Sequence, residues 1–159
     1  MNITACCILI ISLFVNTGKS CSSKEIPDLS VRFVDNRIEL VINNIKNNKG
    51  VIRIGMYNND VGYPDTPSTG FTFAKDTLKS GMLRTFIPVS RSGMYAFSVL
   101  DDENENGKMD YVIGIIPREG FGFSNNPKVS RKAPAFKDTS FRFDGGLKKV
   151  EIKMVYILP

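Results

Sequence analysis

The chain has 159 residues, of which 42% are hydrophobic, and its 21 Lys and Arg exceed its 16 Asp and Glu, which gives a formal net charge of +5. It contains no histidine, so nucleophile pairs of Ser or Cys with His, and zinc sites with His ligands, are excluded. The basic residues are scattered along the chain and are not gathered on a basic helix, which favours a solvated surface over a nucleic-acid interface.

An apolar segment at the N-terminus predicts export. Residues 3–15 are apolar apart from two hydroxyl side chains, and this run is too short to cross a bilayer as a stable helix. Gly18 and Ser20 are small residues at the third and first positions before Cys21, which is the spacing that a signal peptidase cleaves. We therefore expect residues 1–20 to be a signal peptide and the mature chain to begin at Cys21.

Cys21 is also a predicted lipidation site, because bacterial lipoprotein processing acylates a cysteine at the first mature position. Residues 21–30 would then form a leader or tether, whereas Lys19 is a poor residue for a lipoprotein cleavage motif. An anchored lipoprotein and a freely secreted protein both remain open, and a lipid at Cys21 is the only membrane attachment that we expect. Either interpretation places the protein in the periplasm, at the outer membrane or outside the cell.

Residues 31–159 are predicted to form one all-β domain, because apolar residues alternate along the chain and do not recur at helical spacing. Residues 38–42 and 52–56 both have this pattern, and the polar turn at 46–50 between them indicates a hairpin. Further alternating segments are found at 71–73, 83–89, 95–99, 141–143 and 150–156. About seven strands separated by turn residues, without a long amphipathic helix, predict a single antiparallel β-sandwich.

Residues 102–110 match the first nine positions of a calcium loop of the D-x-N-x-N-G-x-x-D type. Calcium binds several hard oxygen ligands at once, and side chains two residues apart can turn inward as the chain curls. Gly107 permits the positive backbone angle of the sharp turn. The candidate ligands are the side-chain oxygens of Asp102, Asn104, Asn106 and Asp110 and the main-chain carbonyl of Lys108.

The calcium motif is incomplete, because the bidentate Glu expected at its twelfth position is Ile113 here. Further oxygens would have to come from water, from Asp101 or from Glu119. Two of the leading ligands are neutral Asn side chains, so we expect a dissociation constant on the order of 0.1 to 1 mM. The alternative is a metal-free turn in which Asp and Asn side chains accept hydrogen bonds from backbone amides.

The segment that follows, residues 117–126, is not a periodic strand. Gly120 and Gly122 alternate with Phe121 and Phe123, so the backbone can pass close to another surface while the rings pack beneath it. Short polar groups follow at Ser124, Asn125 and Asn126, which suit either the binding of a sugar or other polar ligand or the end of a strand.

An ordered set of residues carries a resemblance to a known family. This set is Tyr95, Ala96, Asp102, Glu103, Asn104, Asn106, Gly107, Asp110, Pro117, Glu119, Gly120 and 122–126. It resembles the signature of a family of exported bacterial proteins catalogued as domain of unknown function 2141, over residues 38–156. The resemblance implies a prealbumin-like or related immunoglobulin-like sandwich in the cell envelope, and it implies no established activity.

The chain departs from the family pattern at a few positions. Asp101 stands where the family often has His, Glu105 replaces a frequent Gly, and Gly114 lies three residues before Pro117 instead of two. The change at Asp101 adds a candidate oxygen ligand and removes any role of an imidazole. The loop is also similar to calcium loops in sandwich repeats of surface proteins, which favours the metal interpretation.

Two functional hypotheses follow. The favoured one is a non-catalytic envelope module in which Ca²⁺ stiffens residues 102–110 and residues 119–126 present a surface to a protein or glycan. The alternative is a carboxylate- or metal-dependent hydrolase that acts on an envelope polymer, since two carboxylates suffice for glycoside hydrolysis. The clustered acids Asp101, Asp102, Glu103 and Glu105 lie on one loop, where the separation needed across a cleft is rarely held. A purely structural domain is a third interpretation.

Overall fold

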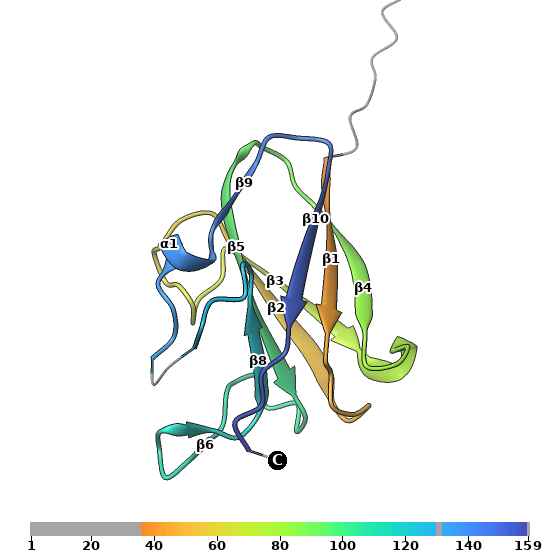
Figure 1. The fold of residues 1–159 in the computed structure, drawn as a ribbon, viewed down its shortest axis with the longest axis vertical. Coiled ribbons are helices and arrows are strands. Elements are labelled where there is room, and N and C mark those ends of the chain that lie inside the picture. Colours follow the sequence, from red (N-terminus) through yellow and green to blue (C-terminus); the bar gives the residue numbers. More distant parts are fainter. Residues whose placement is uncertain (1–35, 130–131, 159) are drawn as a thin grey trace, which may run out of the picture. The chain divides into compact units, whose positions relative to one another are not determined.

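The computed structural model describes residues 36–129 and 132–158 (Figure 1). The predicted signal peptide, the leader with Cys21, and the expected start of the domain at residue 31 lie outside the described residues. Within the described part of the chain, no helix is long and apolar enough to span a membrane.

The described residues form an all-β fold in two main sheets (Figure 1), which confirms the predicted class. The first sheet has the order β10-β1-β4, with β10 at Leu147–Lys153, β1 at Arg37–Asn43 and β4 at Leu83–Pro88. The second has the order β3-β2-β5-β8, with β3 at Thr69–Ala74, β2 at Val51–Tyr57, β5 at Gly93–Asp102 and β8 at Gly120–Phe123. In the second sheet β9 (Phe141–Phe143) pairs with the start of β5.

Short elements complete the described fold. β6 (Tyr111–Val112) and β7 (Ile116–Pro117) form a two-stranded hairpin, η1 (Lys75–Thr77) follows β3, and α1 (Phe136–Thr139) precedes β9. The strand number therefore exceeds the seven that the sequence predicts. One pair, β1 with β10, is parallel, whereas the other ladders are antiparallel.

The predicted hairpin between residues 38–42 and 52–56 is wrong. β1 pairs with β10 and β4, whereas β2 pairs with β3 and β5 in the other sheet. Each strand has a fully apolar inner face, and two such faces are buried best when they oppose one another across the core. The connection at residues 44–50 therefore crosses from one sheet to the other.

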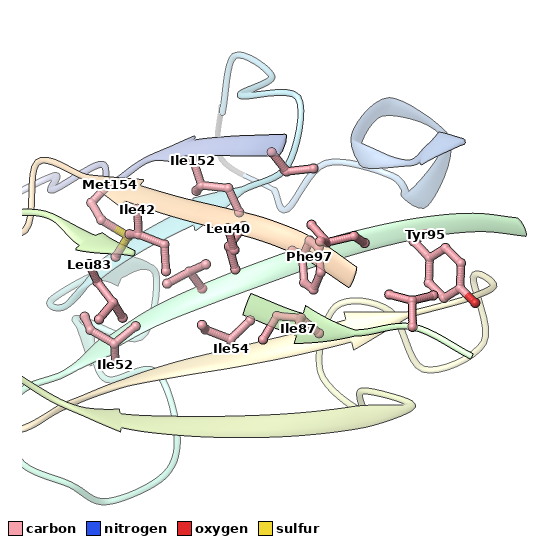
Figure 2. Packing of buried hydrophobic residues seen from close by; sticks show 14 of the residues in the cluster. Leu40, Ile42, Ile52, Ile54, Leu83, Ile87, Tyr95, Phe97, Ile152 and Met154 are labelled. Carbon is pink, nitrogen blue, oxygen red and sulfur yellow. The ribbon is translucent and has the colours of Figure 1, made fainter. Parts of the chain in front are cut away.

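The core consists of the inward-facing residues of both sheets. In Figure 2 the side chains of Leu40, Ile42 and Ile152 lie among those of Ile52, Ile54 and Phe97 from the other sheet. These six side chains are at most 1% exposed. Burial of this kind stabilises a fold by about 25 cal/mol for each Å² of apolar surface removed from water.

Residues 120–123 form the strand β8 although their sequence has no strand periodicity. All four of its residues are buried, and a strand buried on both faces shows no alternation of polar and apolar residues. The predicted close approach is confirmed, because a Cβ on Gly122 would lie 2.6 Å from Ile152. Phe121 and Val155 exchange backbone hydrogen bonds of 3.0 and 2.8 Å, which join β8 to the chain that continues from β10.

Candidate functional site

The candidate loop begins where β5 ends, with two buried carboxylates. Asp101 and Asp102 are the last residues of β5, and each is 0% exposed. Successive side chains of a strand point to opposite faces, so the two carboxylates have different surroundings. Asp102 pairs with Arg53 of β2, whereas Asp101 pairs with Lys75 and Tyr156.

Asp102 closes the first half of the loop by accepting hydrogen bonds from three donors. Its Oδ2 accepts from Gly107 N at 2.9 Å and from Arg53 Nε, and its Oδ1 accepts from Asn106 N at 3.1 Å. Burial raises the pKa of Asp102, but the hydrogen bonds from Arg53, Gly107 and Asn106 outweigh this effect, so the pKa is lowered. Asp102 is therefore a charged anchor for the turn.

Glu119 holds the two ends of the loop together. Its Oε1 accepts a hydrogen bond from Glu103 N and its Oε2 accepts one from Asp110 N, both at 3.2 Å. The residue is 5% exposed. Burial raises the pKa of Glu119, the two backbone hydrogen bonds lower it, and the charges of Asp102 and Asp110 raise it further, with a net increase. Glu119 thus contacts the predicted loop as a clamp on its backbone.

The remaining candidate ligands converge on Asp110. Its carboxylate accepts hydrogen bonds from Asn104 Nδ2 at 2.7 Å and from Asn106 Nδ2 at 3.0 and 3.1 Å. Asn104 Oδ1 accepts from Asn106 N, and Asn106 Oδ1 accepts from Lys108 N. The side chains that would ligate calcium are adjacent, and their amide groups must rotate before both amide oxygens can face a cation.

The loop offers few charged oxygen ligands for a metal ion. No group of three or more Asp, Glu, Cys or His side chains suited to a metal ion is found within residues 36–129 and 132–158. The loop offers the carboxylates of Asp102 and Asp110 with the amide oxygens of Asn104 and Asn106, and Arg53 already neutralises one carboxylate. Calcium binding remains a prediction for this loop.

Asp101 is not brought together with the other predicted ligands. Its Oδ2 accepts a hydrogen bond from the Tyr156 hydroxyl, and its Oδ1 contacts Lys75 Nζ. The alternation along β5 could have predicted that Asp101 points inward, because it shares the inner face with Phe97 and Val99. Sequence reasoning assigned it to the loop and so missed the buried pair with Lys75.

The three polar residues after β8 make their hydrogen bonds within the fold. The Ser124 hydroxyl is buried, accepts from Phe97 N at 2.8 Å and donates to Thr139 O at 2.6 Å. Asn125 donates to Ser140 O, and Asn126 donates to Glu151 O while accepting from Lys153 N. These residues connect β8 to β5, α1 and β10, and of the three only Asn125 and Asn126 are exposed.

The β6–β7 hairpin carries a feature that sequence reasoning missed. Tyr111, Ile113 and Ile115 are 55%, 86% and 75% exposed. The hairpin extends away from the two sheets (Figure 1), and positive backbone angles at Ile113 and Gly114 form its turn. The signal was the short apolar run from Tyr111 to Ile116, interrupted only by Gly114.

The fold and this region define the class as a small β-sandwich protein with a carboxylate-clamped loop and an apolar hairpin beside it. The family model of uncharacterized proteins conserved in bacteria, DUF2141, matches residues 40–151, so the chain belongs to this family. The match includes the loop, the hairpin and β8, and it confirms the resemblance carried by residues 102–126. No curated protein and no solved structure matches the chain.

Proposed function

We propose that the protein is an exported, non-catalytic module of the bacterial cell envelope that binds a protein or glycan partner through the β6–β7 hairpin. The observation that carries the proposal is the exposure of Tyr111, Ile113 and Ile115 on a hairpin with a fixed base. Contiguous exposed apolar side chains on a folded domain mark interaction sites. The two isoleucines favour a protein partner over a glycan, because aliphatic side chains contribute to binding mainly through apolar contact.

The base of the hairpin is ordered by hydrogen bonds from both sides. Asp110 N donates to Glu119, and Arg118 N donates to Asp110 O at 2.9 Å, so residues just before β6 and just after β7 are joined. A surface that is already ordered loses little conformational entropy when it binds. The base of the hairpin that carries Tyr111, Ile113 and Ile115 is therefore held by hydrogen bonds.

Calcium is proposed as the stabiliser of residues 102–110. The ligand spacing supports this assignment, as does the convergence of Asn104 and Asn106 on Asp110. A cation bound by Asp102 and Asp110 would also offset the negative charge of Glu103 and Glu105 in the same loop. Ca²⁺ thus links the loop to the hairpin, because Asp110 immediately precedes β6.

The non-catalytic assignment is supported by the pairing of the acidic side chains. Asp101 contacts Lys75, Asp102 contacts Arg53, and Glu119 accepts two backbone hydrogen bonds. Two hollows of the described fold, with volumes of about 410 and 800 Å³, have no carboxylate in their linings. The alternative hydrolase needs two carboxylates that face one another across a cleft.

The binding proposal is tested with the mature chain immobilised and exposed to solubilised envelope proteins and glycans in calcium-containing buffer. We expect a partner that is retained by the wild type and lost from the Ile113→Ser/Ile115→Ser double variant. Val61→Ser is the matched control, because Val61 is also a β-branched residue with 79% exposure and lies outside the hairpin. Equal retention by the double variant, or no retention by the wild type, contradicts the proposal.

Export is tested separately by fractionation and intact-mass measurement of the chain made in a bacterial host. The proposal predicts a product in the envelope fraction that begins at Cys21. Its mass distinguishes an acylated cysteine from a free one. Recovery of the full chain from the cytoplasm, with Met1 retained, contradicts the export proposal.

A further inference from the structure

The core face of the second sheet contains a buried ion pair between Lys75 of η1 and Asp101 of β5. Lys75 is the first residue of η1, two residues after Phe73 of β3. Ile52 of β2 is the register partner of both Phe73 and Asp101, so these positions form a row across the inner face. The Lys75 side chain reaches across this row, its Nζ contacts Asp101 Oδ1, and both side chains are 0% exposed.

The Lys75 ammonium has unusually few partners. Within the described part of the chain, neither Lys75 Nζ nor Asp101 Oδ1 makes a hydrogen bond besides this contact. An ammonium carries three donors, and burying it beside a single carboxylate oxygen is costly in a low-dielectric interior. Loss of water between the ammonium and the carboxylate would remove both charges from the interior.

From this arrangement we propose that Lys75 and Asp101 react to form an intramolecular amide bond. As one proton passes from Nζ to the Asp101 carboxylate, the lone pair freed on Nζ attacks Cγ of Asp101 and forms the C–N bond. The carboxyl C–O bond then breaks, and its hydroxyl leaves with one proton from the amine as a water molecule. The reaction needs no oxidant and no cofactor, because a desolvated lysine is itself a competent nucleophile.

Tyr156 is the catalytic residue that assists this reaction. Its hydroxyl donates a hydrogen bond of 2.5 Å to Asp101 Oδ2, whereas the contact of Lys75 Nζ is with Oδ1. Burial and the hydrogen bond to Asp101 raise the pKa of Tyr156, so the hydroxyl keeps its proton. It therefore donates to the oxygen on which negative charge develops when Nζ attacks.

The orientation of Tyr156 is fixed by two backbone segments. Lys46 N donates to the Tyr156 hydroxyl at 3.0 Å, and Gly120 leaves the space that the ring occupies. The amide bond would tie the chain after the edge strand β3 to the central strand β5. A cross-link of this kind restricts the unfolded chain as a disulfide does. The proposal requires neither calcium nor a binding partner.

The cross-link is tested by tryptic digestion of the denatured full chain followed by mass spectrometry. Trypsin does not cleave after a lysine whose side chain is an amide, so we expect peptide 54–79 joined to peptide 92–108. The joined species should be lighter than the sum of its parts by one water molecule. The exposed pair of Lys149 and Glu151, whose atoms lie 2.5 Å apart, is the internal control and should remain unreacted.

Recovery of free peptides 76–79 and 92–108, without the joined species, overturns the proposal. Lys75→Met and Asp101→Ala should each abolish the joined species. Asp101→Asn should still react and lose ammonia in place of water, which identifies the carboxyl carbon as the site of attack. Tyr156→Phe, made by cell-free synthesis and digested at timed intervals, should form the cross-link on the order of 100-fold more slowly. An unchanged rate in this variant removes the catalytic role of Tyr156.

Discussion

An added methyl group at Gly120 should lower the stability of the fold by displacing Tyr156. A Cβ there would lie 2.3, 2.6 and 2.9 Å from Cε1, Cζ and Cδ1 of Tyr156, whereas carbon atoms in contact are normally about 3.5–4 Å apart. The ring would have to move by about 1 Å, and this would break the hydrogen bond from the Tyr156 hydroxyl to Asp101.

The expected loss in the free energy of unfolding of Gly120→Ala is the sum of two effects, overpacking and the loss of a hydrogen bond. Overpacking costs about 1–3 kcal/mol, and leaving a buried acceptor without its hydrogen bond costs about 1–3 kcal/mol. Because Tyr156 is half-buried, its ring can partly retreat toward solvent, so we expect a loss of about 3 kcal/mol in the free energy of unfolding. For a domain of this size that corresponds to a fall in Tm of about 10 °C.

Thermal and urea unfolding followed by circular dichroism measures this loss. Gly70→Ala is the matched control, since Gly70 also lies in the second sheet and no atom lies within 4 Å of its added Cβ. The control should change stability by less than about 0.5 kcal/mol. If Gly120→Ala is no less stable than Gly70→Ala, the result contradicts the packing of Tyr156 against β8 and its hydrogen bond to Asp101.

Two further predictions concern Asp102 and Ser124. Burial raises the pKa of Asp102, but its hydrogen bonds lower the pKa overall. The carboxylate therefore contributes stability that is complete above the ordinary pKa of 3.8. This stability is lost as the pH falls through the lower pKa of the folded state. Asp102→Asn should flatten the pH dependence of the urea midpoint between about pH 5 and pH 2, and an unchanged profile would contradict the role of Asp102 as an anchor. Ser124→Ala removes the hydroxyl that joins Phe97 N to Thr139 O and should cost about 1–3 kcal/mol in urea unfolding. The exposed Ser68→Ala control should change stability by less than about 0.5 kcal/mol, and a similarly small change for Ser124 would refute its structural role.

The strand pattern could be predicted from the sequence because alternation records which face of each strand is buried. Ile38, Leu40 and Ile42 were identified as one buried face, and the structure has them at 0% exposure. Alternation does not record which strands are neighbours, so β1 and β2 were wrongly paired as a hairpin. The parallel pairing of β1 with β10 joins residues that lie more than a hundred positions apart, such as Arg37 and Leu147.

The sequence predicted which residues form the candidate loop, but it did not predict most of the contacts that they make. The motif located Asp102, Asn104, Asn106 and Asp110 in one loop, and the structure brings the side chains of Asn104 and Asn106 to that of Asp110. The backbone clamp by Glu119 depends on the return of the chain after β7, which no local pattern specifies. The pairing of Asp101 with Lys75 depends on β2 placing the end of β3, and η1 after it, beside the end of β5, and no local pattern specifies this.

Thermal unfolding with and without calcium tests most directly whether residues 102–110 are a metal-stabilised base for the hairpin. With a dissociation constant of about 0.1–1 mM, about 10 mM Ca²⁺ should stabilise the mature chain by about 1.4–2.7 kcal/mol over a chelator control. We predict that this rise in Tm is lost in Asp110→Asn and kept in Glu105→Gln, which removes a charge from the same loop at a position that provides no ligand. No rise in the wild type, or an equal rise in Asp110→Asn, would contradict calcium binding and leave residues 102–110 as a turn held by hydrogen bonds.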